Sequence, residues 1–360
     1  MTVLADANNM QPTVQKAELK RLVSGIIRAQ GNRFVKELLR EKKIRIGLNK
    51  DDFERNLSDA IDNGQLTLSD VADWLHTVEG WGNQHVYAYY ISESLRRTLT
   101  PGAIQRALAA HGLLDVWDKS SVTAFPEQPE LTSIAFRDSV LTILWHETST
   151  GWSRVPNKDR IEEDGLDIIE LRAWRKLEQR AITRFEIDLN RGIGALFVSD
   201  PVQTAEHQLA IDEAERVIAQ LLDINELHRN QFDISMISKN LDQQNTTSQS
   251  QQKRKITSQK SRLGSGKAYV EFGTDSAEAA YIDEPAVNDL RNAVRAGDLQ
   301  AFQGLNGAFS FHPEDHPWAP TRLINVLLYG KDKRIRIRSQ MARDEVWNIL
   351  STLSEFRESA

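Results

Sequence analysis

The side chains of this sequence best suited to chemistry are basic residues gathered in two short segments. The first set comprises Arg33, Lys36, Arg40, Lys42, Lys43, Arg45 and Lys50. Lys36, Arg40 and Lys43 recur at helical spacing, so they can share one helix face. Clustered cations bind phosphate oxygens, and helix N-termini add N–H groups that attract anions. This segment therefore predicts a surface that contacts the phosphates of a nucleic acid.

The second basic set lies near the C-terminus, in the segment LINVLLYGKDKRIRIRS. Its members are Lys331, Lys333, Arg334, Arg336 and Arg338. Alternation of arginine with isoleucine predicts a strand of a hairpin that turns at residues 330–333, with the arginines on one face. Such a ribbon can lie along a phosphate backbone. It can equally face an acidic part of this chain or a partner subunit.

Basic charge is concentrated within a mildly acidic chain. The 360 residues include 45 Lys and Arg against 51 Asp and Glu, which gives a formal net charge of −6. Residues 14–57 carry 12 basic and 6 acidic side chains, residues 241–267 carry 6 and 1, and residues 322–343 carry 7 and 1. Basic clusters in an acidic protein indicate a polyanion ligand. Solvated helix faces and a soluble linker are the alternative explanation.

Residues 33–57, RFVKELLREKKIRIGLNKDDFERNL, predict two short helices joined by a tight turn. The residues at the spacings of the SAP motif are Ile44, Lys50, Phe53 and Leu57. The segment thus resembles this helix–turn–helix DNA-binding family, which implies double-stranded DNA as the ligand, approached by the helix N-termini and basic flanks. The family has glycine where this chain has Leu48, and Gly47 precedes it. A plain helical hairpin with solvated lysines is the alternative.

Catalytic motifs are sparse in the sequence. With no cysteine, the chain cannot use thiolate chemistry, and it has no nucleophile elbow, zincin helix or kinase signature. Glu186 and Asp188 share one face of a predicted strand, which would suit a metal-dependent nuclease. Solvent-facing alternation against buried Phe185 and Ile187 explains them equally well. We therefore assign no catalytic residue, no cofactor and no metal ligand.

The expected elements define an α+β protein in several parts. We predict a disordered tail over 1–12, a helical SAP-like module over 13–120, a β-rich α+β domain over 121–238, a flexible basic linker over 239–267 and a small α+β module over 268–360. The middle domain combines an antiparallel meander with one long helix at about 203–228. A helical DNA-binding unit ahead of a β-rich domain also resembles the layout of the kinetochore CENP-N family.

These features together favour a non-enzymatic DNA-binding protein that acts as a component of a larger system. Its helical and hairpin surfaces would contact duplex DNA, while the acidic middle domain would serve a protein partner. The alternatives are an adaptor subunit of a multi-gene bacterial system, such as one in anti-phage defence, and a metal-dependent nuclease. The absence of a signal peptide and of an apolar run of spanning length predicts a cytoplasmic protein without membrane contact.

Overall fold

A computed structural model of the whole chain gives the fold. It describes residues 12–29, 31–119, 126–164, 167–199, 204–244, 254–262, 268–275, 280–297, 303–311 and 324–357. The predicted tail lies outside these residues except for Pro12. Within the described residues, no helix has both the length and the apolar character needed to cross a membrane.

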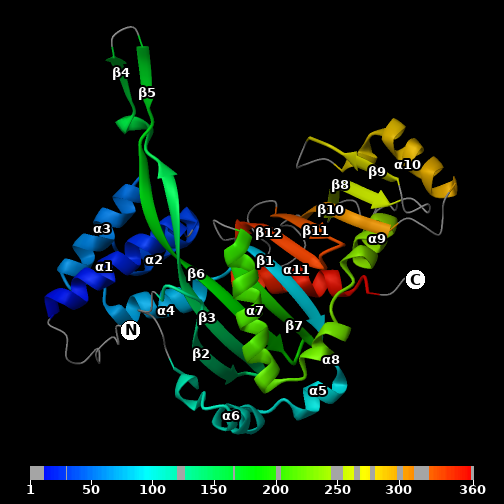
Figure 1. Ribbon diagram of the computed structural model, residues 1–360, viewed down its shortest axis with the longest axis horizontal. Coiled ribbons are helices and arrows are strands. Elements are labelled where there is room, and N and C mark those ends of the chain that lie inside the picture. The colour runs from blue at the N-terminus through cyan, green and yellow to red at the C-terminus, as the bar shows by residue number, and fades with distance from the viewer. Residues whose placement is uncertain are drawn as a thin grey trace.

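Among the described residues, ten strands form a single antiparallel sheet, which confirms the mixed α+β class (Figure 1). In spatial order they are β2 (Glu130–Arg137), β3 (Val140–Arg154), β6 (Trp174–Asp188), β7 (Ile193–Ser199), β1 (Gly82–Tyr90), β12 (Arg334–Gln340), β11 (Ile324–Tyr329), β10 (Gln303–Phe311), β8 (Arg254–Arg262) and β9 (Tyr269–Gly273). β1 thus connects strands from the middle of the sequence to strands from its end.

Helices pack against both faces of this sheet. One face carries α9 (Ile234–Gln244) and α11 (Arg343–Ser354). The core between these helices and the sheet includes Phe197, Ile337 and Trp347. The opposite face is covered over β1, β2, β3, β6 and β7 by α5 (Glu93–Thr98), α6 (Pro101–Ala110), α7 (Thr204–Leu221) and α8 (Ile224–Arg229). A further helix, α10 (Pro285–Gly297), lies near β8 and β9.

A bundle of four helices precedes the sheet. It consists of α1 (Pro12–Ala29), α2 (Asn32–Glu41), α3 (Lys50–Asp62) and α4 (Leu68–Val78). Leu22, Val35, Phe53 and other apolar side chains form a core of their own inside this bundle. The capping box at Thr67 and Asp70 marks the start of α4.

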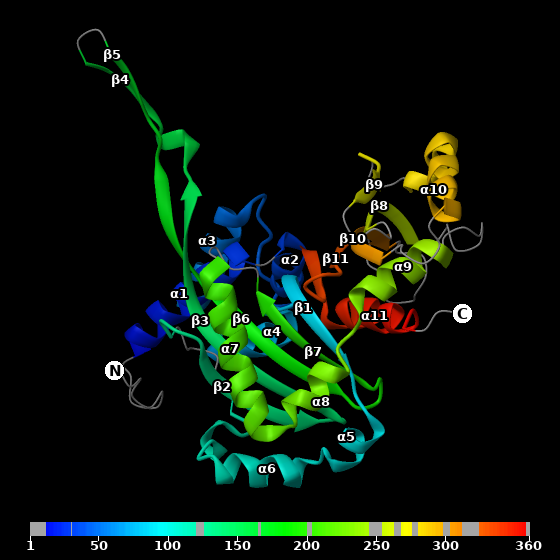
Figure 2. The same cartoon turned by 45° about the vertical axis from the view of Figure 1, so that its right-hand side comes forward.

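A long ribbon projects from the body of the molecule (Figure 2). β3 and β6 remain paired as far as Arg154 and Trp174. Beyond them, β4 (Arg160–Asp164) and β5 (Asp167–Leu171) form a separate two-stranded sheet. We call residues 151–164 and 167–175 the arm, and β4 and β5 together its tip.

Three sequence expectations about organisation need correction. Of the residues predicted to form a linker, 239–244 complete α9 and 254–262 form β8. The rest of that stretch lies outside the described residues. Gln259 and Ser261 of β8 are fully buried, and Ser238 donates a 3.0 Å hydrogen bond to Gln259. The predicted long helix ends at Leu221, because Asp223 caps a second helix. The predicted modules also share one sheet.

Candidate nucleic-acid interface

Helices α2 and α3 form the predicted helical hairpin (Figure 1). The buried side chains between them and their neighbours are Phe34, Val35, Leu38 and Leu39 of α2 and Phe53 and Leu57 of α3. Asn49 caps α3, since its side chain accepts a 2.9 Å hydrogen bond from the backbone N–H of Asp52. Both predicted helices and this cap are confirmed.

The turn between these helices accounts for the position of its glycine. A Cβ atom at Gly47 would lie 2.1 Å from the Cβ of Asp52, so a larger residue would clash. Asp52 is held there because its carboxylate accepts the backbone N–H of Leu48 at 3.0 Å. The side chain of Leu48, at the position of the SAP glycine, is 92% exposed. Glycine is thus required at position 47 of this turn.

Within the helical hairpin, two of the basic residues predicted to contact DNA form ion pairs inside the chain; Arg334 of β12 also pairs with Asp332 at 3.5 Å. Arg33 makes a bidentate pair with Glu345 of α11, with both N–O distances at 3.2 Å. Lys42 donates a 2.7 Å hydrogen bond to Asp70 of α4. That bond, with further bonds from Thr67, lowers the pKa of Asp70 to about 2. These two cations therefore fasten α2 to neighbouring helices.

The remaining basic residues of this segment differ in exposure. Arg40, Lys43 and Arg45 are exposed, and none of them forms an ion pair with any residue that the structure describes. Lys36 and Lys50 are half-buried, and the ammonium of Lys36 lies 6.0 Å from the centroid of the Phe53 ring. The exposed positive charge is thus concentrated at the end of α2 and in the turn after it.

The N-terminus of α3 is poorly suited to phosphate. The Asn49 side chain already occupies one of its N–H groups, and its first turn contains Asp51 and Asp52. Carboxylates there compete with any anion for the positive end of the helix dipole. The first turn of α2 has no acidic residue and no side-chain cap. The expected approach of helix N-termini to DNA is therefore disfavoured at α3.

The C-terminal basic hairpin forms as predicted. β11 and β12 pair with Leu328 beside Ile335 and Val326 beside Ile337. These four apolar side chains are fully buried on the face that packs against α11. The basic residues of β12 are Arg334, Arg336 and Arg338, which alternate with them and lie on the opposite face. Arg338 is exposed, as are Lys331 and Lys333 in the turn.

A row of polar and aromatic side chains crosses the sheet on this opposite face. In register order it consists of Arg334 of β12, Tyr329 of β11, Asn306 of β10, Lys260 of β8 and Glu271 of β9. Paired residues of an antiparallel sheet project to the same side. The helices described on this side pack over the other five strands. We call this side of β12, β11, β10, β8 and β9 the open face.

Two cations on the open face stack on tyrosine rings. The guanidinium of Arg334 lies 4.6 Å from the Tyr329 centroid, and the ammonium of Lys260 lies 3.9 Å from the Tyr269 centroid. Such pairs are worth about 0.5–1 kcal/mol at exposed sites. Sequence reasoning missed both residues because Lys260 lies within the stretch interpreted as a linker and Tyr269 follows shortly after it. The alternation in RKITSQKSR is the signal that could have revealed the strand.

Comparison with known proteins assigns no family to this chain. No family model and no curated protein matches it. Three features of the molecule therefore bear on function: the open face, the helical hairpin and the surroundings of the candidate catalytic carboxylates.

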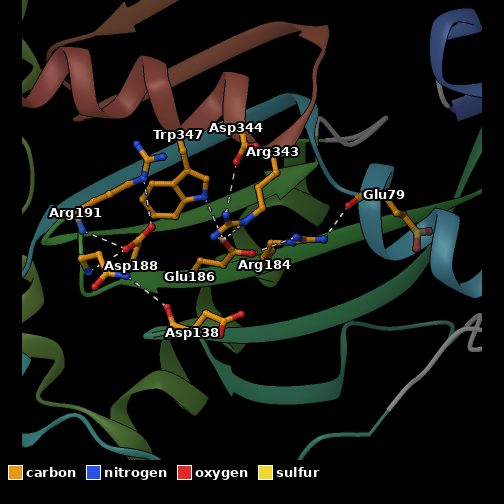
Figure 3. Close-up of polar contacts among 10 residues, drawn as sticks. Glu79, Asp138, Arg184, Glu186, Asp188, Arg191, Arg343, Asp344 and Trp347 are labelled. Atoms are coloured by element: carbon orange, nitrogen blue, oxygen red, sulfur yellow. Dashed lines mark hydrogen bonds and ion pairs between the residues drawn. The ribbon is translucent and has the colours of Figure 1, made fainter. Parts of the chain in front are cut away.

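The carboxylate of Glu186, considered for metal chemistry, is buried in a network of arginines (Figure 3). Its side chain is on β6 and is 2% exposed. It accepts hydrogen bonds at 3.0–3.2 Å from Arg184, Arg343 and the indole N–H of Trp347. The face of β6 that carries Glu186 lies under α11, so the expected solvent-facing alternation is wrong.

Asp188 is equally engaged in local structure. Its carboxylate accepts the backbone N–H groups of Asn190 and Arg191 at 3.0 and 3.1 Å. It also pairs with the Arg191 side chain at 3.3 Å. These bonds shape the turn between β6 and β7. The contacts of both carboxylates support a structural role and leave the nuclease alternative without its candidate residues.

The arginine network continues to the end of the helical bundle. Arg184 donates a 2.8 Å hydrogen bond to the carbonyl of Glu79, and Arg180 pairs with the Glu79 carboxylate at 3.2 Å. Burial raises the pKa of Glu79. Burial and the charges of the two arginines hold the pKa of His146 well below its usual value of 6.5. This network therefore joins the bundle, the sheet and α11.

Proposed function

We propose that this protein is a non-enzymatic DNA-binding protein whose main contacts are to phosphates. The observation that supports this proposal most is on the open face, where Arg334, Arg336 and Arg338 occupy alternate positions along β12. Residues two apart in a strand are separated by about 6.8 Å, so the three side chains form a line of about 14 Å. Cations in a line, with the Tyr329 ring on the next strand, suit a sugar–phosphate chain.

The helical hairpin supplies a second surface for the same ligand. Its exposed residues Arg40, Lys43 and Arg45 lie in the segment 33–57 that resembles the SAP motif. That resemblance favours double-stranded DNA as the ligand. The Arg33–Glu345 ion pair holds α2 against α11, so this surface has a fixed position relative to β12. Two weak phosphate-binding surfaces on one chain strengthen binding when both can reach the same DNA.

The test is the binding of a labelled DNA duplex to the full chain, followed by fluorescence anisotropy across a salt series. The variant Arg334→Gln/Arg338→Gln is compared with the control Arg97→Gln/Arg229→Gln. Both remove two positive charges, but the control residues are exposed on α5 and α8. Each lost phosphate contact should lower the slope of log affinity against log salt by about 1. The control should retain the wild-type slope.

Other outcomes would relocate or reject the binding surface. A loss confined to Arg40→Gln/Lys43→Gln/Arg45→Gln would place binding on the helical hairpin alone. Equal binding by all variants would show that neither surface is used. Tighter binding of a single strand than of the duplex would favour base stacking on the open face over duplex recognition. No salt-sensitive binding of either DNA would refute the proposed function.

A further inference from the structure

The arm exposes large apolar side chains. At its tip Ile161 and Ile168 are 75% and 76% exposed, and near its base Trp152 and Trp174 are 67% and 54% exposed. Figure 2 shows the arm extending away from the sheet and its helices. Apolar side chains concentrated on one projecting element mark an interaction site.

The base of the arm is held in a defined conformation. Arg154 pairs with Asp159, and its guanidinium lies 5.5 Å from the centroid of the Trp174 ring. Asp159 also accepts the backbone N–H of Ala173 at 2.9 Å. The bonds from Arg154 and Ala173 lower the pKa of Asp159 to about 2, so this joint persists at neutral pH. A preorganised base reduces the entropy lost when the tip meets a partner.

The register of the tip places apolar and acidic side chains together. Ile161 lies opposite Glu170, and Ile168 lies opposite Glu163, so these four side chains share one face of the hairpin. The other face carries Ile169 and Leu171, which are less exposed at 40% and 43%, beside Glu162 and Arg160. A partner surface that fits the face of Ile161 and Ile168 must therefore combine apolar contact with positive charge.

The charge of the tip discriminates among ligands. β4 and β5 together include five acidic residues and one basic residue. This excess of negative charge repels nucleic acid and anionic lipid headgroups, and it repels the identical tip of a second copy. It attracts a basic protein surface. The tip is thus unsuited to the ligand of the open face.

We propose that the tip of the arm docks into an apolar groove, rimmed by Lys and Arg side chains, on a different protein. The groove receives Ile161 and Ile168, while its basic rim pairs with Glu163 and Glu170. A two-stranded hairpin alone is marginally stable in water, and the groove supplies the apolar contact that β4 and β5 lack. This interaction goes beyond DNA binding and does not depend on it.

The experiment begins with the full chain carrying a photo-crosslinking phenylalanine in place of Ile168, expressed in its source cells. The crosslinked protein is identified, purified and titrated with the full chain by calorimetry. The tip variants are Ile161→Ser/Ile168→Ser and Glu163→Lys/Glu170→Lys. The matched control is Leu209→Ser/Leu290→Ser, because these leucines are exposed on α7 and α10. Thermal melting confirms that each variant folds.

We expect each tip variant to weaken binding at least tenfold and the control to stay within twofold. The effect of charge reversal should shrink as salt is raised. The proposal is overturned if no product forms at the tip, or if the product is a second copy of this chain or a nucleic acid. It is also overturned if either tip variant binds the identified protein as tightly as the wild type.

Discussion

Replacing Glu186 with glutamine tests whether the buried arginine network holds the molecule together. Glutamine keeps the shape of the side chain but removes the charge that faces Arg184 and Arg343. The Arg184 side chain cannot rotate into solvent, because it is buried and its guanidinium lies 4.2 Å from the centroid of the Trp81 ring. Arg343, whose side chain is 34% exposed, can be hydrated. Breaking a buried pair costs about 3–5 kcal/mol, so we expect a loss of about 3 kcal/mol.

The assay is urea unfolding followed by the fluorescence of the buried tryptophans. The control is Glu162→Gln, since Glu162 is exposed at the tip of the arm and should change stability by less than about 0.5 kcal/mol. If the free energy of unfolding of Glu186→Gln lies within about 1 kcal/mol of the wild-type value, the network does not stabilise the fold. A Glu186→Gln chain that remains folded but loses a metal-dependent DNA cleavage would instead revive the nuclease alternative.

Three other sites give effects of defined sign. The pKa of His146 is lowered in the folded state, so the unfolded chain binds the proton more tightly. The free energy of unfolding should therefore fall by up to about 1.4 kcal/mol per pH unit below about pH 6.5. His146→Gln should remove this part of the pH dependence in urea unfolding. Gly47→Ala should lower the free energy of unfolding by about 1–3 kcal/mol in thermal melts. Gly102→Ala should not, because its Cβ would meet only Nη1 of Arg106 at an ordinary contact distance of 3.6 Å. Asp242→Asn should cost about 3–5 kcal/mol on urea unfolding, because fully buried Arg291 loses its charged partner; a loss below about 1 kcal/mol would contradict this.

Elements with a strong local pattern were predictable from the sequence. The hairpin of β6 and β7 and that of β11 and β12 are confirmed where alternation flanks a short turn. β8 was missed because Gln259 and Ser261 fill buried positions that usually hold apolar residues. The pairing of β1 with β12 was also missed, since contact between distant segments leaves no periodic signal in either one.

The candidate site was predictable in part for the same reason. The arginine face of β12 follows from period-two alternation, and the structure reproduces it. The ion pair of Arg33 with Glu345 could not be foreseen, because 312 positions separate the two residues. Tyr329 and Tyr269 lie beside Arg334 and Lys260 only because whole strands pair. Local pattern therefore identified the charges, and tertiary structure decided which of them face outward.

The central position of β1 also means that the sheet cannot be completed until late in the synthesis of this protein. β1 is complete at Tyr90, but its partner β12 begins at Arg334, about 240 residues later. At about 5–20 residues per second, a ribosome needs roughly 12–50 s to bridge that interval. During this time one edge of β1 has no strand to pair with, and the other edge gains its partner β7 only after Ser199 has been made. The nascent chain therefore passes through a long period with an exposed sheet edge, when protection by a chaperone would matter most.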